Sequence, residues 1–416
     1  MSENVLISGA GIAGPALAYW LRRYGFTPTV VETAPAPRPG GQTVDIRGVA
    51  REVVERMGLM HQIRDRQLHE KGLEYVSASG RRAAAFPAEL MDGAGPVAEI
   101  EILRGDLSEV LLEATTDVEY LYGDSITALV QDDRGVQVSF RRGGERRFDL
   151  VVGADGVHSK VRSLAFGAET QYVRNLGGYG CYFTIRTPES LDHWMKIYTA
   201  PGGRWVGLRP DHDPQYARAF LSFRSPELTY DRRDVAQQKA LLEQRFAGLG
   251  WHTRQVLDGM HEADDFYFDS SSQVVVPEWS QGRVVLVGDA GYCGSPLAGH
   301  GTALSLVGAY VLAGELATDR NHRTAFPQYQ QVMQAYVEQR MELPPGGLKM
   351  AMPMTAAGIW LRNTSTRLMT SRPFRGALAK AAAVKPDAID LRDYAHPTQE
   401  ADGVTTGLTQ SIPSRE

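Results

Sequence analysis

The chain has 416 residues, a formal net charge of −5 and 43% hydrophobic residues. This length favours two joined domains over one small core, and the slight negative charge argues against nucleic acid or an anionic membrane surface as the main partner. The chain has two cysteines, Cys181 and Cys293, which is too few for a disulfide framework or a metal-ligand cluster. We therefore expect no metal site and a reducing, cytoplasmic location.

The N-terminal part has the pattern of a βαβ unit. Hydrophobic periodicity predicts a buried strand over 4–8, a helix over 12–24 and a second strand over 29–31. A Pro/Gly-rich loop follows at 34–41. Apolar residues near helical spacing then predict one helix over 48–70.

The middle of the chain alternates between a helix and short strands. A helix is predicted over 106–114, followed by strands at 118–121, 126–130, 136–140 and 148–152. From 176 to 268 the strands are aromatic-rich and separated by turns, which indicates an antiparallel sheet. These strands are predicted at 179–186, 194–198, 205–209 and 217–223.

The C-terminal part is predicted to be mainly helical. A strand at 284–287 precedes an apolar helix at 302–317, which carries Glu315 and falls short of the ~20 residues that span a bilayer. We therefore expect no membrane span. Helical segments continue to about residue 384, and a polar tail follows that we expect to pack loosely.

The first motif lies between the first strand and the first helix. Glycines there permit a tight turn and close approach of a pyrophosphate, and the helix N-terminus offers free N–H groups to that anion. Glu32, at the end of the second strand, would accept hydrogen bonds from ribose hydroxyls. This context favours a dinucleotide site over an ordinary turn, without separating FAD from NAD. The candidate residues are Gly9, Gly11, Ile12, Ala13, Gly14 and Glu32.

Two later strands each run into an acidic residue. Asp155 follows one of them and Asp289 follows the other, so both would reach the carboxyl edge of the sheet, where ligands of such folds bind. Asp289 can accept hydrogen bonds from a ribityl chain. Asp155 is a second candidate for cofactor binding, with a cap of the next helix as the alternative. The helix start after Asp289 would face the flavin ring and stabilise negative charge on it. It comprises Pro296, Gly299, Gly301 and Thr302.

With these three motifs in order, the chain resembles the class A flavoprotein monooxygenases, the para-hydroxybenzoate hydroxylase-like family. Residues 40–46, Gly-Gly-Gln-Thr-Val-Asp-Ile, resemble a segment of the tetracycline-inactivating monooxygenases, which makes Asp45 a candidate for cofactor binding. Arg47 beside it would reach the flavin or the substrate mouth, with a surface arginine as the alternative. Arg104 matches the family's Arg-x-x-Leu helix start, where the arginine contacts the cofactor.

The resemblance implies an α/β fold. It has a Rossmann-like FAD-binding domain of the GR2 type, a substrate domain over a mixed or antiparallel β-sheet, and bridging C-terminal helices. We assign the chain on this basis as follows: FAD-binding domain, 1–72, 97–175 and 269–345; substrate domain, 73–96 and 176–268; C-terminal helical segment, 346–385; polar tail, 386–416.

The resemblance also implies an FAD-dependent monooxygenase that uses NADPH or NADH and O2. It would hydroxylate an aromatic or polycyclic, polyketide-like small molecule through a flavin C4a-hydroperoxide, and a monomer is plausible. Because the flavin carries this chemistry, no catalytic side chain is assigned. Trp205, Arg209 and Phe220 are the candidates for the substrate pocket, with a plain sheet core as the alternative.

Two other functions stay open. One is a different flavin enzyme of the same fold: an epoxidase, an oxidase or a halogenase. The other is a non-catalytic flavoprotein that sequesters a small molecule. The second is suggested by departures from the family pattern at Tyr292 and Ala303, and Gly308 is a further departure.

Overall fold

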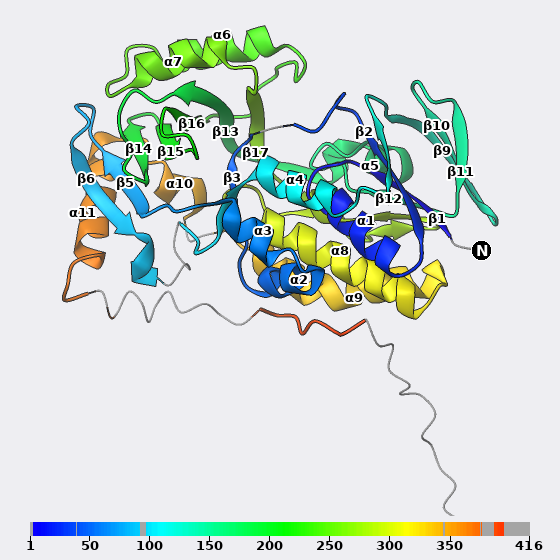
Figure 1. The fold of residues 1–416 in the computed structure, drawn as a ribbon. Coiled ribbons are helices and arrows are strands. Elements are labelled where there is room, and N and C mark those ends of the chain that lie inside the picture. Colours follow the sequence, from blue (N-terminus) through cyan, green and yellow to red (C-terminus); the bar gives the residue numbers. More distant parts are fainter. Residues whose placement is uncertain are drawn as a thin grey trace, which may run out of the picture.

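The computed structural model describes residues 3–38, 40–91, 97–343, 346–374, 376 and 387–394. Two parts lie side by side in Figure 1, each built on a large β-sheet. The part on the right holds the predicted cofactor motifs. The part on the left holds the aromatic-rich strands.

The first sheet has six strands and is parallel except at one edge. Its central strands are buried on both faces, and Val5, Leu6 and Ile7 have no exposed surface, as expected for a parallel sheet covered on both sides. The antiparallel pair lies at one edge and comes first in the strand order given next. The order is β18 (Ser280–Gln281), β19 (Val284–Leu286), β12 (Leu150–Gly153), β1 (Asn4–Ser8), β2 (Thr27–Glu32) and β8 (Glu119–Tyr122).

Helices and a small sheet cover the two faces of this sheet. On one side lie α1 (Ala13–Arg23), α4 (Arg104–Glu113) and the apolar helix α8 (Gly301–Thr318), which packs on α1. The other side carries α5 (Lys160–Ala165) and an antiparallel sheet. That sheet consists of β9 (Ile126–Asp132), β10 (Gly135–Phe140) and β11 (Glu145–Phe148).

Two predictions in this part were wrong in detail. The single helix expected over 48–70 is two helices, α2 (Val49–Met57) and α3 (Met60–Asp65), followed by the short strand β4 (Gln67–Leu68). The first helix ends because Gly58 adopts a left-handed φ of +76°, as glycines after helices commonly do. The single strand expected at 148–152 is shared between β11 and β12, which lie in different sheets.

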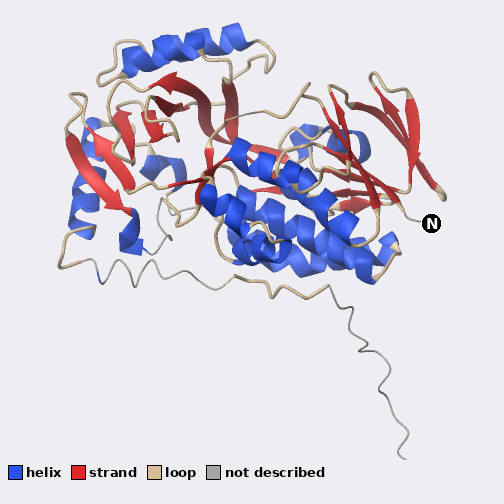
Figure 2. Ribbon diagram, in the orientation of Figure 1, coloured by secondary structure: helices blue, strands red, loops and turns tan. Residues whose placement is uncertain are grey.

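The second sheet has eight strands, and every neighbouring pair is antiparallel except β14 with β5. Two helices cover one of its faces, α6 (Val235–Phe246) and α7 (Thr253–Glu262) (Figure 2). Neither helix was predicted from the sequence. The strand order is β20 (Tyr292–Cys293), β17 (Tyr267–Val275), β13 (Val173–Arg186), β16 (Tyr216–Arg224), β15 (Arg204–Pro210), β14 (Trp194–Ala200), β5 (Gly72–Val76) and β6 (Arg82–Pro87).

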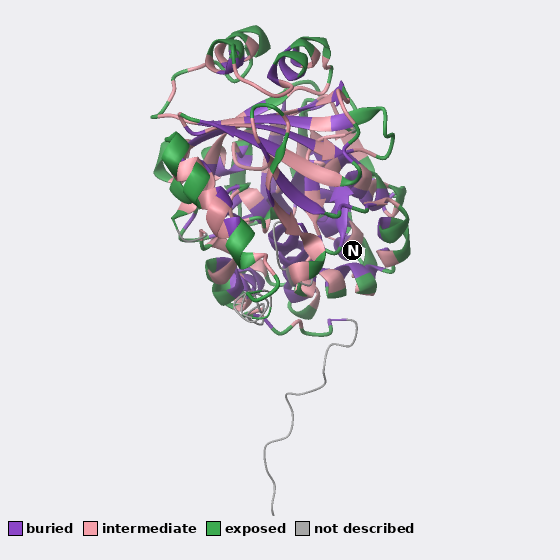
Figure 3. Ribbon diagram, turned by 90° about the vertical axis from the view of Figure 1, so that its left-hand side faces the viewer, coloured by how far each residue is buried: buried purple, intermediate pink, exposed green. Residues whose placement is uncertain are grey.

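Two strands of the eight-stranded sheet cross the predicted domain boundaries. β13 and β17 pair from Val173↔Val274 to Tyr182↔Tyr267, so both run across the domain boundaries placed at 175 and 268. A three-stranded sheet of β3 (Thr43–Asp45), β7 (Glu101–Leu103) and β4 adds a second bridge. Figure 3 shows that buried residues concentrate in the strands, whereas the outer sides of the surface helices are exposed.

The C-terminal part is helical, with α9 (His322–Met341), α10 (Gly347–Ala351) and α11 (Ala356–Met369). Residues 387–394, expected in a loose tail, instead pack on α8, since the Tyr394 hydroxyl donates to Glu315 at 2.7 Å and the Tyr394 ring fills the space beside Gly314. Among the described residues, α8 alone is long and apolar enough to cross a membrane, and it is mostly buried inside the fold.

Tyr292 and Gly308, two positions at which the sequence departs from the family pattern, pack against each other. Tyr292 is buried, and its hydroxyl lies 2.5 Å from that of Tyr329, which also donates to the Leu286 carbonyl. A Cβ on Gly308 would lie 2.2 Å from the Tyr292 hydroxyl but 3.4 Å from its ring carbon Cζ. The glycine therefore makes room for the tyrosine hydroxyl within the core.

We expect Gly308→Ala to lower the free energy of unfolding by about 1–3 kcal/mol through this overlap, although alanine favours a helix over glycine by about 1 kcal/mol. In a Tyr292→Phe background, where the hydroxyl is gone, the same substitution should be neutral or stabilising. Denaturant unfolding of the two single variants and the double variant measures the coupling. An equal loss in both backgrounds would contradict the overlap.

Candidate functional site

The first and second motifs touch at the carboxyl edge of the parallel sheet. Gly9 has a φ of +109°, and a Cβ there would lie 2.5 Å from the Ala154 carbonyl oxygen. A Cβ on Gly14 would lie 1.9 Å from the Gly9 carbonyl oxygen. Neither position can hold a side chain, because strand, turn and helix approach too closely.

The third motif joins the first two. Gly288 has a φ of +62°, and a Cβ there would lie 3.3 Å from the Cβ of Ala13, in the first turn of α1. Ile12, the N-cap residue, contributes no side-chain hydrogen bond to that helix start. The structure thus brings together three motifs that are separated by more than a hundred residues in the chain.

Arg104 and Glu32 flank the glycine turn. A Cβ on Gly11 would lie 3.2 Å from the Arg104 guanidinium, and burial lowers the pKa of Arg104. Glu32 accepts hydrogen bonds from the amides of Ala10 at 2.9 Å and Ala34 at 2.8 Å. Because each carboxylate oxygen has a second lone pair, Glu32 can still accept from ribose hydroxyls.

Asp289 provides the clearest sign of a ligand site. The residue is half-buried, but its Oδ1 atom is buried and has no hydrogen-bond partner within the described part of the chain. Burial raises the pKa of this carboxyl. A buried acceptor without a partner is costly, and a ribityl hydroxyl would supply the donor. Asp289 therefore fits FAD.

The start of α8 lies next to Asp289. A Cβ on Gly301 would lie 3.7 Å from Asp289 Oδ1, and a Cβ on Gly299 would meet no atom within 4 Å. His300 occupies the N-cap without a side-chain cap, so the first amides of α8 are available to a ligand. Pro296 is exposed at the beginning of this loop, and Thr302 is buried in the first turn.

Arg47 contributes to the electrostatics of the same place. Its Nε lies 2.6 Å from Asp45 Oδ2, and its side chain is 20% exposed. Contact of Arg47 with the flavin or the substrate stays a prediction. Burial and the charges of Arg340 and Arg47 lower the pKa of His300 to about 4. His300 is therefore neutral at pH 7. It was not among the predicted residues, although its position directly before Gly301 was a usable signal.

Asp155 caps a helix, as in the alternative reading. It accepts from the Lys160 amide at 2.8 Å, the Val161 amide at 3.1 Å and the Ser159 hydroxyl. Nearby, the fully buried Arg162 donates to the carbonyls of Ala290 and Val157. These contacts hold the second and third motifs together, and contact between Asp155 and the cofactor stays a prediction.

A charged cluster beside the second motif was also missed. His158 hydrogen-bonds Asp269 at 3.0 Å and Glu169 at 3.2 Å, and Tyr267 donates to Asp269 at 2.8 Å. Burial alone would lower the pKa of His158, but the hydrogen bonds to Asp269 and Glu169 raise it to about 9. The cluster connects the cofactor part to β17.

The three substrate candidates lie on one face of the eight-stranded sheet, opposite α6 and α7. Trp205 and Phe220 belong to an apolar cluster there, and Phe220 lies over Gly207. Arg209 differs, because two carboxylates occupy its guanidinium: Glu70 at 3.0 and 3.1 Å and Glu101 at 2.5 Å. Arg209 is thus an internal ion-pair partner, and the prediction that it faces a substrate loses its support.

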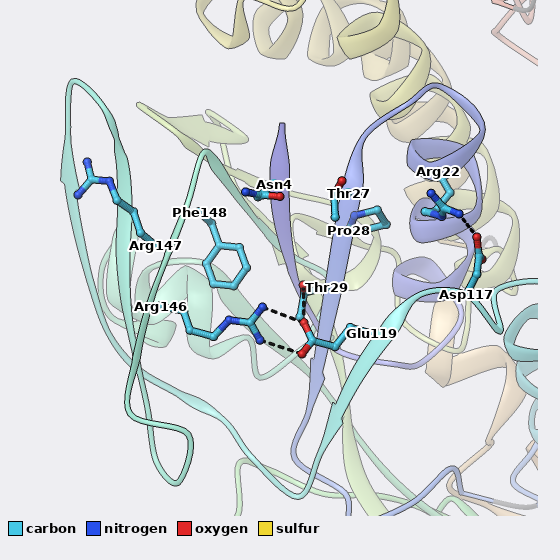
Figure 4. A pocket seen from close by; sticks show the side chains of 10 residues that line it. All are labelled: Asn4, Arg22, Thr27, Pro28, Thr29, Asp117, Glu119, Arg146, Arg147 and Phe148. Atoms are coloured by element: carbon cyan, nitrogen blue, oxygen red, sulfur yellow. Dashed lines mark hydrogen bonds and ion pairs between the residues drawn. The ribbon is translucent and has the colours of Figure 1, made fainter. Parts of the chain in front are cut away.

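A polar hollow of about 320 Å³ lies at the opposite edge of the parallel sheet, beside Asn4 and Thr29 (Figure 4). Arg146 binds Glu119 at 3.1 and 2.8 Å, and Arg22 pairs with Asp117. These charges compensate one another, and the hollow lies at the amino ends of the strands. Because ligands of such folds bind at the carboxyl ends, the candidate site is the carboxyl edge and not this hollow.

Comparison with known proteins agrees with this geometry. Residues 2–343 match the family model described as "FAD binding domain". The chain belongs to this family. The match confirms the predicted fold and FAD as the cofactor.

Relatives identify the kind of enzyme. The chain is 44% identical to the uncharacterized protein Rv1260 of Mycobacterium tuberculosis, over 83% of this chain and 94% of that protein. It is 40% identical to a flavin-dependent monooxygenase of Legionella longbeachae, over 81% and 87%. The crystal structure of the tetracycline destructase Tet(51) superposes with a TM-score of 0.78 at 35% identity, over 95% of this chain and all of that chain. The predicted FAD-dependent monooxygenase is confirmed.

We expect Asp289→Ala to weaken FAD binding by about 10–100-fold, the cost of one hydrogen bond to a charged acceptor. Titration of the flavin-free protein with FAD, followed by flavin fluorescence, measures this. Asp289→Asn is the matched control, since its amide oxygen still accepts and most of the affinity should remain. Unchanged affinity of the alanine variant would remove Asp289 from the site.

The raised pKa of His158 predicts a pH dependence of stability. Its stabilising contribution is complete below the unfolded pKa of about 6.5 and is lost as the pH rises through about 9. We expect this loss to be about 1–2 kcal/mol after allowance for solvent screening. Unfolding at pH 6 and pH 9.5 should show it in the wild type and not in His158→Gln, a comparison that cancels the other titrating groups. An equal change in the free energy of unfolding between pH 6 and pH 9.5 in both proteins would contradict this contribution of His158.

Proposed function

We propose that the enzyme hydroxylates an aromatic or polycyclic, polyketide-like molecule held against the aromatic face of the eight-stranded sheet. The balanced reaction converts a substrate C–H, O2, NAD(P)H and a proton into C–OH, NAD(P)+ and water. Bound FAD supplies the oxygen-activating chemistry. The monomeric state and the cytoplasmic location are also part of the proposal.

The main support for this proposal is the aromatic face of the eight-stranded sheet. Trp205, Tyr182, Phe220 and Tyr75 lie in or against one apolar cluster on that face, which suits a planar substrate. Two contacts connect this face to the cofactor part. Arg209 forms an ion pair with Glu101, and Arg218 lies beside Gly40. A substrate on this face would therefore lie next to the cofactor site.

The same face offers hydrogen-bond donors. Trp205 and Thr199 are cross-strand partners, and Trp205 Nε1 and Thr199 Oγ1 are buried without a partner among the described residues. Since buried donors are normally paired, an acceptor on a ligand would satisfy them. Carbonyl and enol oxygens of an oxygenated polycyclic compound have this chemistry.

The cofactor side of the site has matching roles for the chain's own residues. Glu32 would accept from ribose hydroxyls, Arg104 would face the pyrophosphate, and Asp289 would accept from the ribityl chain. The amides at the start of α8 would stabilise negative charge on the flavin by about 0.3–2 kcal/mol. Neutral His300 adds no charge there.

Turnover of tetracycline under 18O2, with NADPH and FAD-loaded enzyme, tests the function. We expect a product heavier by one labelled oxygen. Thr199→Val should raise KM about 5–10-fold by removing one hydrogen bond, while Thr127→Val on the distant β9 should leave KM unchanged. NADPH oxidation that yields only hydrogen peroxide would indicate an oxidase. Tetracycline binding without turnover would indicate sequestration.

A further inference from the structure

Helix α11 is oriented opposite to an ordinary surface helix. Its buried residues are polar, Asn363 and Thr366, whereas the apolar residues Trp360, Leu361 and Leu368 are 66%, 62% and 55% exposed. The exposed apolar residues continue through Met369 to Phe374. Figure 1 shows α11 at the outer edge of the molecule beside β6. Contiguous exposed apolar surface of this kind marks an interaction site.

The orientation of α11 is set by specific contacts. Arg362 stacks on the Tyr75 ring at 3.7 Å and donates to the Ala351 carbonyl at 3.0 Å. Arg367 donates to the Ala83 carbonyl of β6. The polar side of α11 therefore faces the protein, and the apolar side faces outward.

The charge of this part of the chain is unlike that of the rest. Residues 343–386 contain seven Lys or Arg and no Asp or Glu. Since the whole chain carries −5, this stretch has +7 and the remainder −12. The small net charge of the whole chain therefore includes a strongly basic segment. The expectation that an anionic membrane is not the main partner was based on the net charge alone.

A hollow next to α10 adds to the basic surface. It has a volume of about 630 Å³ and is lined by Arg224, Lys349 and apolar residues, among them Leu348 and Met354. Among the described residues, no Asp or Glu lines it. Such a lining suits an anionic headgroup with an adjoining hydrocarbon chain.

We propose that α11, together with the α10 hollow, is a surface that binds an anionic lipid bilayer reversibly. Exposed Trp, Leu, Met and Phe side chains would enter the interfacial region, and the exposed Lys349 and Arg372 would face the lipid phosphates. A second copy of the chain fits less well, because a twofold contact through α11 would bring two strongly basic segments together. The proposal is independent of the substrate.

Sedimentation of the full-length, FAD-loaded enzyme with vesicles tests this proposal. We expect binding to vesicles of phosphatidylglycerol and phosphatidylcholine, little binding to phosphatidylcholine alone, and weakening by salt. Trp360→Ser with Leu361→Ser should reduce the partition coefficient at least about ten-fold. Lys349→Gln with Arg372→Gln should reduce it about five-fold for each charge removed.

Matched controls lie on the β9–β10 hairpin, far from α11. Val130 is as exposed as Trp360, and Arg134 is an exposed arginine, so Val130→Ser and Arg134→Gln should leave vesicle binding unchanged. Failure to bind anionic vesicles, or equal binding by all variants, would overturn the proposal. So would a concentration-dependent dimer in light scattering that is lost in Trp360→Ser.

Discussion

The architecture depends on the close contact of three backbone turns at the carboxyl edge of one parallel sheet. β12, β1 and β19 lie near one another in the strand order, so the loops that follow them must share a small volume. Gly9, Gly14 and Gly288 permit this, because a Cβ at each would come within 3.3 Å of another turn or helix. The ligand-facing amides, Asp289 and Arg104 take their positions from this contact.

The sequence was sufficient for the parallel sheet and for the three motifs at its carboxyl edge, because both follow local rules. Buried parallel strands are continuous apolar runs, and glycine turns have fixed spacing. It was insufficient where non-local contacts decide the structure. The tail residues 387–394 look polar, yet Tyr394 packs against Gly314 of α8. The helices α6 and α7 were not predicted, because the aromatic-rich strands on either side of them indicated an antiparallel sheet over the whole of residues 176–268.

Single charged residues were the least predictable part of the site, since their partners come from distant segments. Arg209 has the position expected for a substrate ligand, but Glu70 and Glu101 neutralise it. Burial raises the pKa of Glu101, and the charge of Arg209 opposes that rise. Removing the arginine would leave two buried carboxyl groups unpaired, a cost of about 3–5 kcal/mol. Arg209 therefore connects the eight-stranded sheet to the three-stranded sheet of β3, β7 and β4.

The same reasoning from contacts bears on the non-catalytic alternative, which was based on departures from the family pattern. Tyr292 and Gly308 compensate each other sterically, since the tyrosine hydroxyl occupies the space that a Gly308 side chain would need. Ala303 is buried within the same core. The departures thus replace one packed arrangement by another and leave the Asp289 acceptor and the start of α8 intact. They provide no physical ground for a loss of catalysis.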